Sequence, residues 1–297
     1  MDPFSISTLS IATLVATALG LRATKKKTLT PLGVATGCTV GFLLVATGLR
    51  GMNLLFFYQI GTMATRFKKS IKEKRDATLA GDHSARGAVQ VLCVSLTTVV
   101  LSLIHAIWIG RERPVAFPKD RSDGVFLASC LTCAVLAHHA TCLADTLASE
   151  LGILSTRSPI LITQPWRFVP PGTNGGITIT GTVWSIAGGA MIGCLTVVMD
   201  WFSGLSPLNA TQMIFFGGTM GLVGSMLDSL LGATLQSSYY DKDQKLIYHA
   251  NSDDVPKSAK RISGINILTN EQVNFFSALA SALLGGFVIA PIIFRER

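Results

Sequence analysis

The sequence predicts an all-α, polytopic membrane protein with about eight transmembrane helices. Of its 297 residues, 49% are hydrophobic and 14% are charged, whereas a soluble domain carries about 25% charged residues. The mean hydropathy of the chain is +0.48. These values exclude ordinary soluble α/β enzymes, disordered chains and disulfide scaffolds. We therefore expect residues 1–297 to form a single integral membrane domain.

Apolar runs mark the individual spans, because a helix needs about 20 apolar residues to cross the hydrocarbon layer. The third run is short, so seven spans is the alternative. The first run lacks a basic n-region and is not a good cleavable signal. The predicted spans are Phe4–Leu21, Thr28–Gly48, Gly51–Thr65, Gly87–Gly110, Gly124–Leu147, Gly176–Met199, Gln212–Gln236 and Val273–Ile293.

Basic residues predict the orientation in the membrane. Alternate connections, at 22–27, 66–86, 157–167 and 242–261, hold 18 of the 25 lysines and arginines. The positive-inside rule places these connections in the cytosol and both termini on the other side. Segments 66–86 and 237–270 are then cytosolic loops. The net charge of +8 suits anionic headgroups or phosphates, and we expect no nucleic acid partner because no basic soluble domain is present.

All six cysteines lie in apolar runs, which favours buried free thiols over disulfides. Cys130, Cys133 and Cys142 share one apolar segment with His138 and His139. A single helix cannot wrap these side chains around a tetrahedral zinc ion. Either histidine could instead serve as an intramembrane proton or hydrogen-bond partner.

Two aspartates lie near the cytosolic ends of the fifth and seventh spans. At about 100° per residue, Asp145 shares a helix face with the small residues Ala148 and Gly152, while Glu150 points roughly 140° away. An acid at a wet helix end is the simpler alternative for Asp145, whereas an intramembrane carboxylate such as Asp228 usually marks function. Magnesium prefers hard oxygen ligands and few carboxylates. We expect Asp145 and Asp228 to bind Mg²⁺ across a cytosol-open cavity.

The segment Pro170–Gly176 precedes the sixth span. Its prolines end any preceding helix, and its glycines permit positive φ. Successive N–H groups at a helix N-terminus form an anion site, and a plain interfacial turn is the alternative. No Walker A motif is present. We expect Arg86, Glu150, Gly172, Thr173, Asn174, Gly175, Gly176, Gln236 and Asn274 to contact substrate or its phosphates.

The loop 66–86 also supplies cations. Lys68 and Lys69 follow an aromatic residue at the end of a span, so we expect them to act in catalysis by neutralising a transferring phosphoryl group. Other basic residues of this loop are expected to be solvated or to anchor headgroups, namely Lys72, Lys74 and Arg75. Asn274 begins a polar stripe on the eighth span that continues through Ser277, Ser281 and Gly285.

Four of these motifs together resemble the transmembrane protein 19 family, whose plant members are the chloroplast phytyl-phosphate kinases of tocopherol synthesis. They are Arg66–Lys69, Asp145–Gly152, Pro171–Thr178 and Asp228–Gln236. The likeness covers about residues 28–293. It implies an all-helical membrane protein and, for the plant branch, a kinase that converts an isoprenyl monophosphate into the diphosphate.

The spacing of Asp145, Ala148 and Gly152 is also similar to the acidic motif of CTP-dependent polyprenol kinases, which implies a nucleoside triphosphate donor. No plastid transit peptide precedes the first span, so an endoplasmic reticulum-type membrane is expected.

The leading hypothesis is therefore phosphoryl transfer from a nucleoside triphosphate to an isoprenyl (phytyl- or geranylgeranyl-type) monophosphate in the lipid bilayer. A carrier for a phosphorylated or anionic metabolite is the alternative, although no internal repeat is evident and the polar motifs lie on one side. A third reading is a non-catalytic multi-pass membrane protein. The kinase hypothesis requires Asp145, Asp228, Asn174 and Lys69 to meet in one cytosol-facing pocket.

Overall fold

The computed structural model describes residues 2–77, 85–119, 124–206, 209–249 and 255–295. Helices account for most of these residues. They are α1 (Ile6–Lys25), α2 (Pro31–Thr47), the 3₁₀ turn η1 (Leu49–Met52), α3 (Asn53–Arg66), α4 (Lys69–Lys72), α5 (Ala88–Cys93), α6 (Leu96–Trp108), α7 (Val125–Gly152), α8 (Ile179–Phe202), α9 (Ala210–Leu235), α10 (Asn270–Leu284), the π-helical turn η3 (Gly285–Ile289) and α11 (Ala290–Ile293).

Each predicted span contains helix, so the predicted helical, multi-pass architecture is confirmed. Within the described ranges, five helical segments are long and apolar enough to cross a membrane: α1, α7, α8, α9 and the continuous segment Asn270–Ile293. Helices α2 and α6 are apolar but shorter. The exact number of crossings stays a prediction.

Two spans differ in detail from their predicted form. The fourth is divided into α5 and α6, because the backbone leaves helical geometry at Val94 and Ser95, and the Ser95 hydroxyl donates to the carbonyl of Val91. The sixth begins at Ile179 instead of Gly176, since Thr178 caps α8 by accepting a hydrogen bond from Gly181 N–H.

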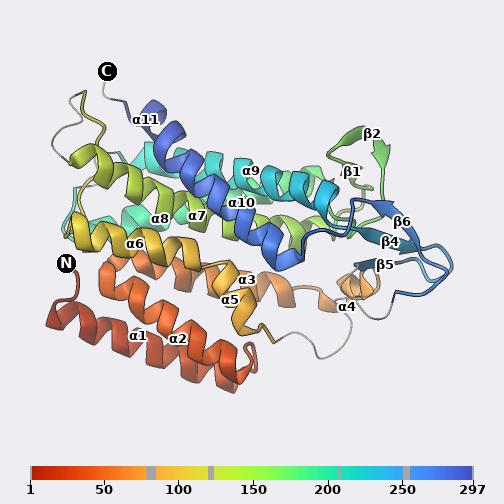
Figure 1. Ribbon diagram of the computed structural model, residues 1–297, viewed down its shortest axis with the longest axis horizontal. Coiled ribbons are helices and arrows are strands. Elements are labelled where there is room, and N and C mark those ends of the chain that lie inside the picture. Colours follow the sequence, from red (N-terminus) through yellow and green to blue (C-terminus); the bar gives the residue numbers. More distant parts are fainter. Residues whose placement is uncertain (1, 78–84, 120–123, 207–208, 250–254, 296–297) are drawn as a thin grey trace.

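Helix α7 lies at the centre of the bundle, packed against α3, α6, α8, α9 and α10 (Figure 1). Its residues 128–144 are all buried, although many are polar or small. Helices α8 and α9 approach so closely that a Cβ on Gly189 would lie 2.1 Å from the carbonyl oxygen of Gly217. Small residues at such crossings are typical of membrane helices. Helix α1 packs mainly on α2, at the edge of the bundle.

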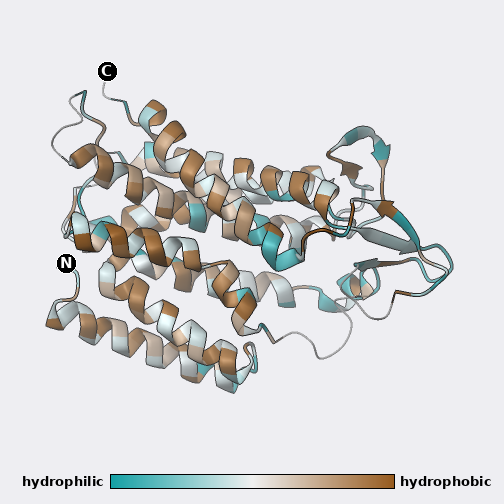
Figure 2. Ribbon diagram, viewed as in Figure 1, coloured by the Kyte–Doolittle hydropathy of each residue, from teal (hydrophilic) through white to brown (hydrophobic). Residues whose placement is uncertain are grey.

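Two small antiparallel sheets, which the sequence did not predict, lie at one end of the molecule, opposite both termini (Figure 1). Figure 2 shows hydrophilic residues gathered around these strands and the start of α10, with hydrophobic residues along the helices. The strand orders of the two sheets are β2-β1-β3 and β5-β4-β6. The strands are β1 (Ile160–Leu161), β2 (Gln164–Phe168), β3 (Gly176–Ile177), β4 (Ser238–Asp241), β5 (Leu246–His249) and β6 (Lys260–Ser263).

The two predicted loops contain regular structure. Segment 66–86 includes α4, and segment 237–270 folds into the second sheet instead of a simple surface excursion. Residues 78–84 and 250–254 of these loops lie outside the described residues. The cysteines are free thiols. Cys130, Cys133 and Cys142 are buried as predicted, but Cys38 and Cys93 are half-buried and Cys194 on α8 is exposed.

Candidate functional site

A cavity of about 1210 Å³ opens at the sheet end of the bundle. Its walls come from α3, α5, α7, α8, α9, α10, β5 and the glycine-rich segment 172–176. The cavity brings together most of the predicted site residues. These are Arg86, Asp145, Glu150, Gly172, Thr173, Asn174, Gly175, Gly176, Asp228, Gln236 and Asn274.

A contact one helical turn below the two aspartates sets their relative position. Thr141 of α7 packs on Gly224 of α9 so tightly that a Cβ on Gly224 would lie 2.0 Å from the Thr141 hydroxyl oxygen. That hydroxyl is also 2.6 Å from the Ser281 hydroxyl of α10. Residues four apart share a helix face. Asp145 therefore lies one turn after Thr141 on the same face of α7, and Asp228 lies one turn after Gly224 on the same face of α9.

Asp145 and Asp228 therefore form the next layer, and both line the cavity. Ser277, one turn from Ser281 on α10, donates a 2.9 Å hydrogen bond to Oδ2 of Asp228. Among the described residues, Asp145 has no hydrogen-bond or ion-pair partner. Asp145 thus presents a carboxylate to the cavity, while Asp228 is oriented by Ser277.

The oxygen donors of this layer suit a magnesium ion that shares its coordination shell with phosphates and water. No group of three or more histidine, cysteine, aspartate or glutamate side chains in the described parts of the chain is arranged to hold a metal ion. An all-protein cage is therefore absent from those parts. Two carboxylates completed by substrate phosphates match the usual magnesium arrangement.

The glycine-rich segment lines the cavity in a conformation that requires glycine. Gly172 and Gly175 have φ values of +93° and +76°, and a Cβ on Gly175 would lie 2.3 Å from the Cβ of Ala233. The predicted N–H cradle is nevertheless largely occupied. Three donors bond within the protein, because Thr173 N–H donates to Pro170, Asn174 N–H to the Ser238 hydroxyl, and Gly176 N–H to Thr173.

The start of α8 also lines the cavity. Thr178 and Gly181 are part of the cavity wall, and a Cβ on Gly152 would lie 3.3 Å from Cα of Gly181, so α7 and α8 meet closely at this point. The cavity-lining N–H groups of Gly181 and Thr182 donate to Thr178, so this 24-residue helix offers an anion the partial positive charge of its dipole. The sequence signal was a Thr-x-x-Gly cap directly after the glycine run, and sequence reasoning missed it.

Arg86 is the arginine that lines the cavity. Its backbone is fixed by bonds with Thr28 and Thr30, ahead of α2. Its guanidinium lies 3.5 Å from the Thr65 hydroxyl of α3. Burial lowers the pKa of this guanidinium from its ordinary value, yet arginine stays charged in proteins. Arg86 thus supplies a cation to the cavity, as predicted for a phosphate contact.

The lysines of segment 66–86 are arranged differently from the prediction. Lys68 is exposed over the Phe67 ring in a left-handed backbone conformation, and Lys69 pairs with Glu73 at 3.5 Å. Neither lysine is among the cavity-lining residues.

Lys72, predicted to be solvated, is instead only 1% exposed. Its ammonium donates to the last carbonyls of α3, at Ala64 and Thr65, and to Glu150 at 2.5 Å. Lys72 is buried because its ammonium neutralises a carboxylate and satisfies carbonyl groups at a helix C-terminus at the same point.

His249 and Asp76 also line the cavity and were not predicted. Nε2 of His249 lies 3.5 Å from Oδ2 of Asp76, and Nδ1 of His249 lies 3.2 Å from Nδ2 of Asn174. His249 of β5 thus contacts both the glycine-rich segment and the residues that follow α4. Both residues fall in polar segments between spans, where single-sequence reasoning offers no distinguishing signal.

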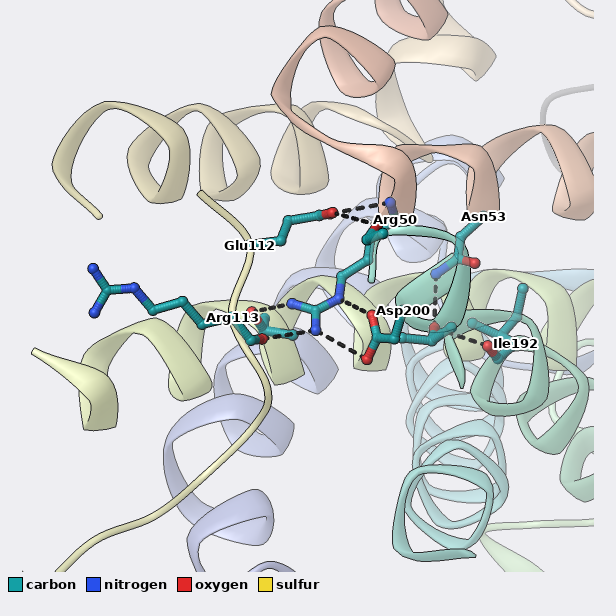
Figure 3. Close-up of polar contacts among 9 residues, drawn as sticks. Arg50, Asn53, Glu112, Arg113, Ile192 and Asp200 are labelled. Carbon is teal, nitrogen blue, oxygen red and sulfur yellow. Dashed lines mark hydrogen bonds and ion pairs between the residues drawn. The ribbon is translucent and has the colours of Figure 1, made fainter. Parts of the chain in front are cut away.

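At the opposite end of the bundle lies a second buried polar cluster (Figure 3). Arg50 of η1 bonds both carboxylate oxygens of Asp200 on α8, at 2.7 and 3.0 Å, and also reaches the Thr132 hydroxyl of α7. Glu112 accepts from the Arg50 backbone N–H. Asn53 donates to Thr196 at 2.9 Å. This cluster joins η1, α7 and α8.

These features define a multi-pass helical membrane protein with a polar, carboxylate-bearing cavity at one end. The chain belongs to the integral membrane protein family DUF92, whose model matches residues 14–282. This match and the relatives below confirm the resemblance predicted from the motifs. No solved structure matches the chain.

Similar proteins occur in plants, bacteria and archaea. Protein PGR of Arabidopsis thaliana is 31% identical over 93% of this chain and 94% of its own length. An uncharacterised membrane protein of Synechocystis is 31% identical over 72% of this chain and 74% of its own length. Another, from Methanocaldococcus jannaschii, is 23% identical over 96% of this chain and 95% of its own length.

Proposed function

We propose that this protein is a membrane-embedded kinase that transfers a phosphoryl group from a nucleoside triphosphate to an isoprenyl monophosphate, giving the diphosphate. The observation that carries the proposal is the pairing of Asp145 and Asp228. They come from two neighbouring helices and line one cavity with Arg86 and the start of α8. This combination of carboxylates with phosphate-binding groups suits a metal-assisted phosphoryl transfer.

In the proposed reaction, an oxygen of the lipid monophosphate attacks the terminal phosphorus of the nucleoside triphosphate. A new P–O bond forms, and the P–O bond to the leaving nucleoside diphosphate breaks with its electron pair on the leaving oxygen. Arg86 and the positive end of the α8 dipole hold the two anions together. Positioning and charge neutralisation supply most of the catalysis in such reactions.

Asp145 and Asp228 are the proposed ligands of Mg²⁺, with Ser277 orienting Asp228. When bound, the ion would offset the negative charge of the meeting phosphates. Glu150 is not a proposed ligand, because Lys72 already neutralises it. This assignment keeps the number of protein carboxylates at two, as magnesium sites on phosphate substrates usually have.

The proposed site faces the cytosol of an endoplasmic reticulum-type membrane. Support comes from the positive-inside rule and from the basic segment 66–86, which follows α3 and contains the cavity-lining residue Arg86. Nucleoside triphosphates would then reach the cavity from the cytosol while the lipid stays in the bilayer. The carrier alternative has weaker support, because the predicted site residues gather at one end of the bundle.

The test is transfer of labelled terminal phosphate to phytyl, geranylgeranyl and farnesyl monophosphate by the purified protein. We expect Asp145→Asn and Asp228→Asn each to lower the rate roughly 100-fold or more, as loss of a charge-stabilising group does in other enzymes. Asp243→Asn, at an exposed position, is the matched control and should leave the rate unchanged. Wild-type rates in both cavity variants would overturn the proposal.

A further inference from the structure

The cavity has an apolar arm in addition to its polar end. Leu54 and Phe57 of α3 form one wall. Val91 of α5 and Val94, which directly follows α5, form another. The Ser95 hydroxyl also lines this part but already donates to the carbonyl of Val91. From these two helices the arm therefore offers mainly hydrocarbon to an occupant, with the amide of Gln90 on α5 beside it.

This arm extends along α3 away from the phosphate-binding end. A Cβ on Gly61 of α3 would lie 4.0 Å from the guanidinium of Arg86, and Leu54 lies near the start of the same helix. At 1.5 Å per residue Gly61 and Leu54 are about 10 Å apart along the axis. An occupant that begins beside Arg86 and follows α3 thus extends into the bundle.

The cavity lining on α3 begins at Leu54, and buried side chains fill the bundle before it. The preceding residue, Asn53, is 1% exposed and bonded to Thr196. One turn earlier, Arg50 is held by Asp200 (Figure 3). A buried charged pair with its hydrogen bonds made does not open easily, so the arm has a fixed end.

We propose that the arm holds the isoprenoid tail of the lipid monophosphate and that Leu54, Phe57 and Val91 set the longest chain the protein accepts. The identity of the lipid rests on the proposed function. An isoprenoid chain has no hydrogen-bonding groups, so it gains from hydrocarbon walls. A closed end restricts length, because a longer tail must leave the arm or displace packed side chains.

The experiment is equilibrium binding of labelled C10, C15 and C20 prenyl monophosphates to the purified full-length protein, without nucleotide. Leu54→Trp and Val91→Trp each fill the arm from a different wall. Their matched controls are Met63→Trp on α3 and Val89→Trp on α5, whose side chains are 70% and 66% exposed. Native folding of each variant is checked by its elution profile and thermal unfolding.

We expect each cavity variant to weaken C20 binding at least tenfold while C10 binding stays within twofold of wild type, and the controls to bind all three lipids normally. Uniform weakening of all chain lengths, or no change in either folded variant, would overturn the proposal. Because nucleotide is omitted, chain-selective binding by a protein that transfers no phosphate would support the tail site and refute the kinase. Failure of the wild type to bind any of the three lipids would refute both.

Discussion

Lys72 and Glu150 form a buried ion pair that closes the space between α3 and α7 at the cavity end. The ammonium lies 2.5 Å from Oε2 of Glu150 and also satisfies two terminal carbonyls of α3. Glu150 follows Asp145 by just over one turn on α7. The pair therefore fixes α3 and the end of α7, which both line the cavity, relative to each other.

Replacement of Lys72 by methionine should destabilise the protein strongly. Methionine fills similar space but leaves the Glu150 carboxylate without its partner. Such a change costs about 3–5 kcal/mol in fully buried pairs and less here, because the Glu150 side chain is 16% exposed and lines the cavity. We expect a lower temperature of thermal unfolding in detergent. Lys74→Met, at an exposed position of the same loop, serves as control and should unfold as wild type does.

The double variant Lys72→Met, Glu150→Gln should recover part of that loss, because no unpaired charge remains. An unchanged unfolding temperature in Lys72→Met alone would show that water, not Lys72, satisfies Glu150.

The Arg50–Asp200 pair should matter for stability rather than for lipid transfer. Arg50→Met leaves Asp200 buried without its bidentate partner, and we expect a loss of about 3–5 kcal/mol, seen as a lower unfolding temperature. Arg111→Met is the control, since its side chain is 64% exposed. If Arg50→Met unfolds normally but abolishes transfer, this cluster belongs to the functional machinery instead.

The sequence predicted the helices well because apolar runs of membrane length have few alternatives. It also indicated Asp145 and Asp228 as candidates, since carboxylates within such runs are rare, and both line one cavity. Lys72 was misplaced because a charge run in a loop gives no sign of which lysine meets a buried acid. The pairing of His249 with Asp76 and Asn174 depends on strands that join distant segments, and no local pattern encodes those contacts.

Magnesium removal should abolish transfer, and Ser277 should tune the metal requirement. Chelation is expected to stop the reaction and added Mg²⁺ to restore it. Ser277→Ala frees Asp228 from its orienting hydrogen bond, and loss of such outer contacts weakens metal binding about 10–100-fold. The half-saturating Mg²⁺ concentration should rise accordingly.

Ser10→Ala, at an exposed position on α1, is the matched control for this metal requirement. Its hydroxyl donates to the carbonyl of Ile6 within the same helix and should not affect the ion. Equal Mg²⁺ dependence in wild type and Ser277→Ala would argue against Asp228 as a ligand.

Gly175→Ala should displace the glycine-rich segment from the cavity wall. Alanine disfavours φ of +76°, at a cost of roughly 1–2 kcal/mol, and its Cβ would also lie 2.3 Å from the Cβ of Ala233 on α9. The clash pushes Asn174 away from His249, so we expect a lower unfolding temperature together with weaker nucleotide or lipid-phosphate binding.

Gly172→Ala separates backbone strain from the clash, because Gly172 shares the positive φ but an added Cβ there meets no atom nearer than 3.6 Å. The Gly172→Ala variant should lose stability through backbone strain alone and retain more binding than Gly175→Ala. Equal losses of stability and binding in the two variants would mean that close packing against α9 does not position this segment.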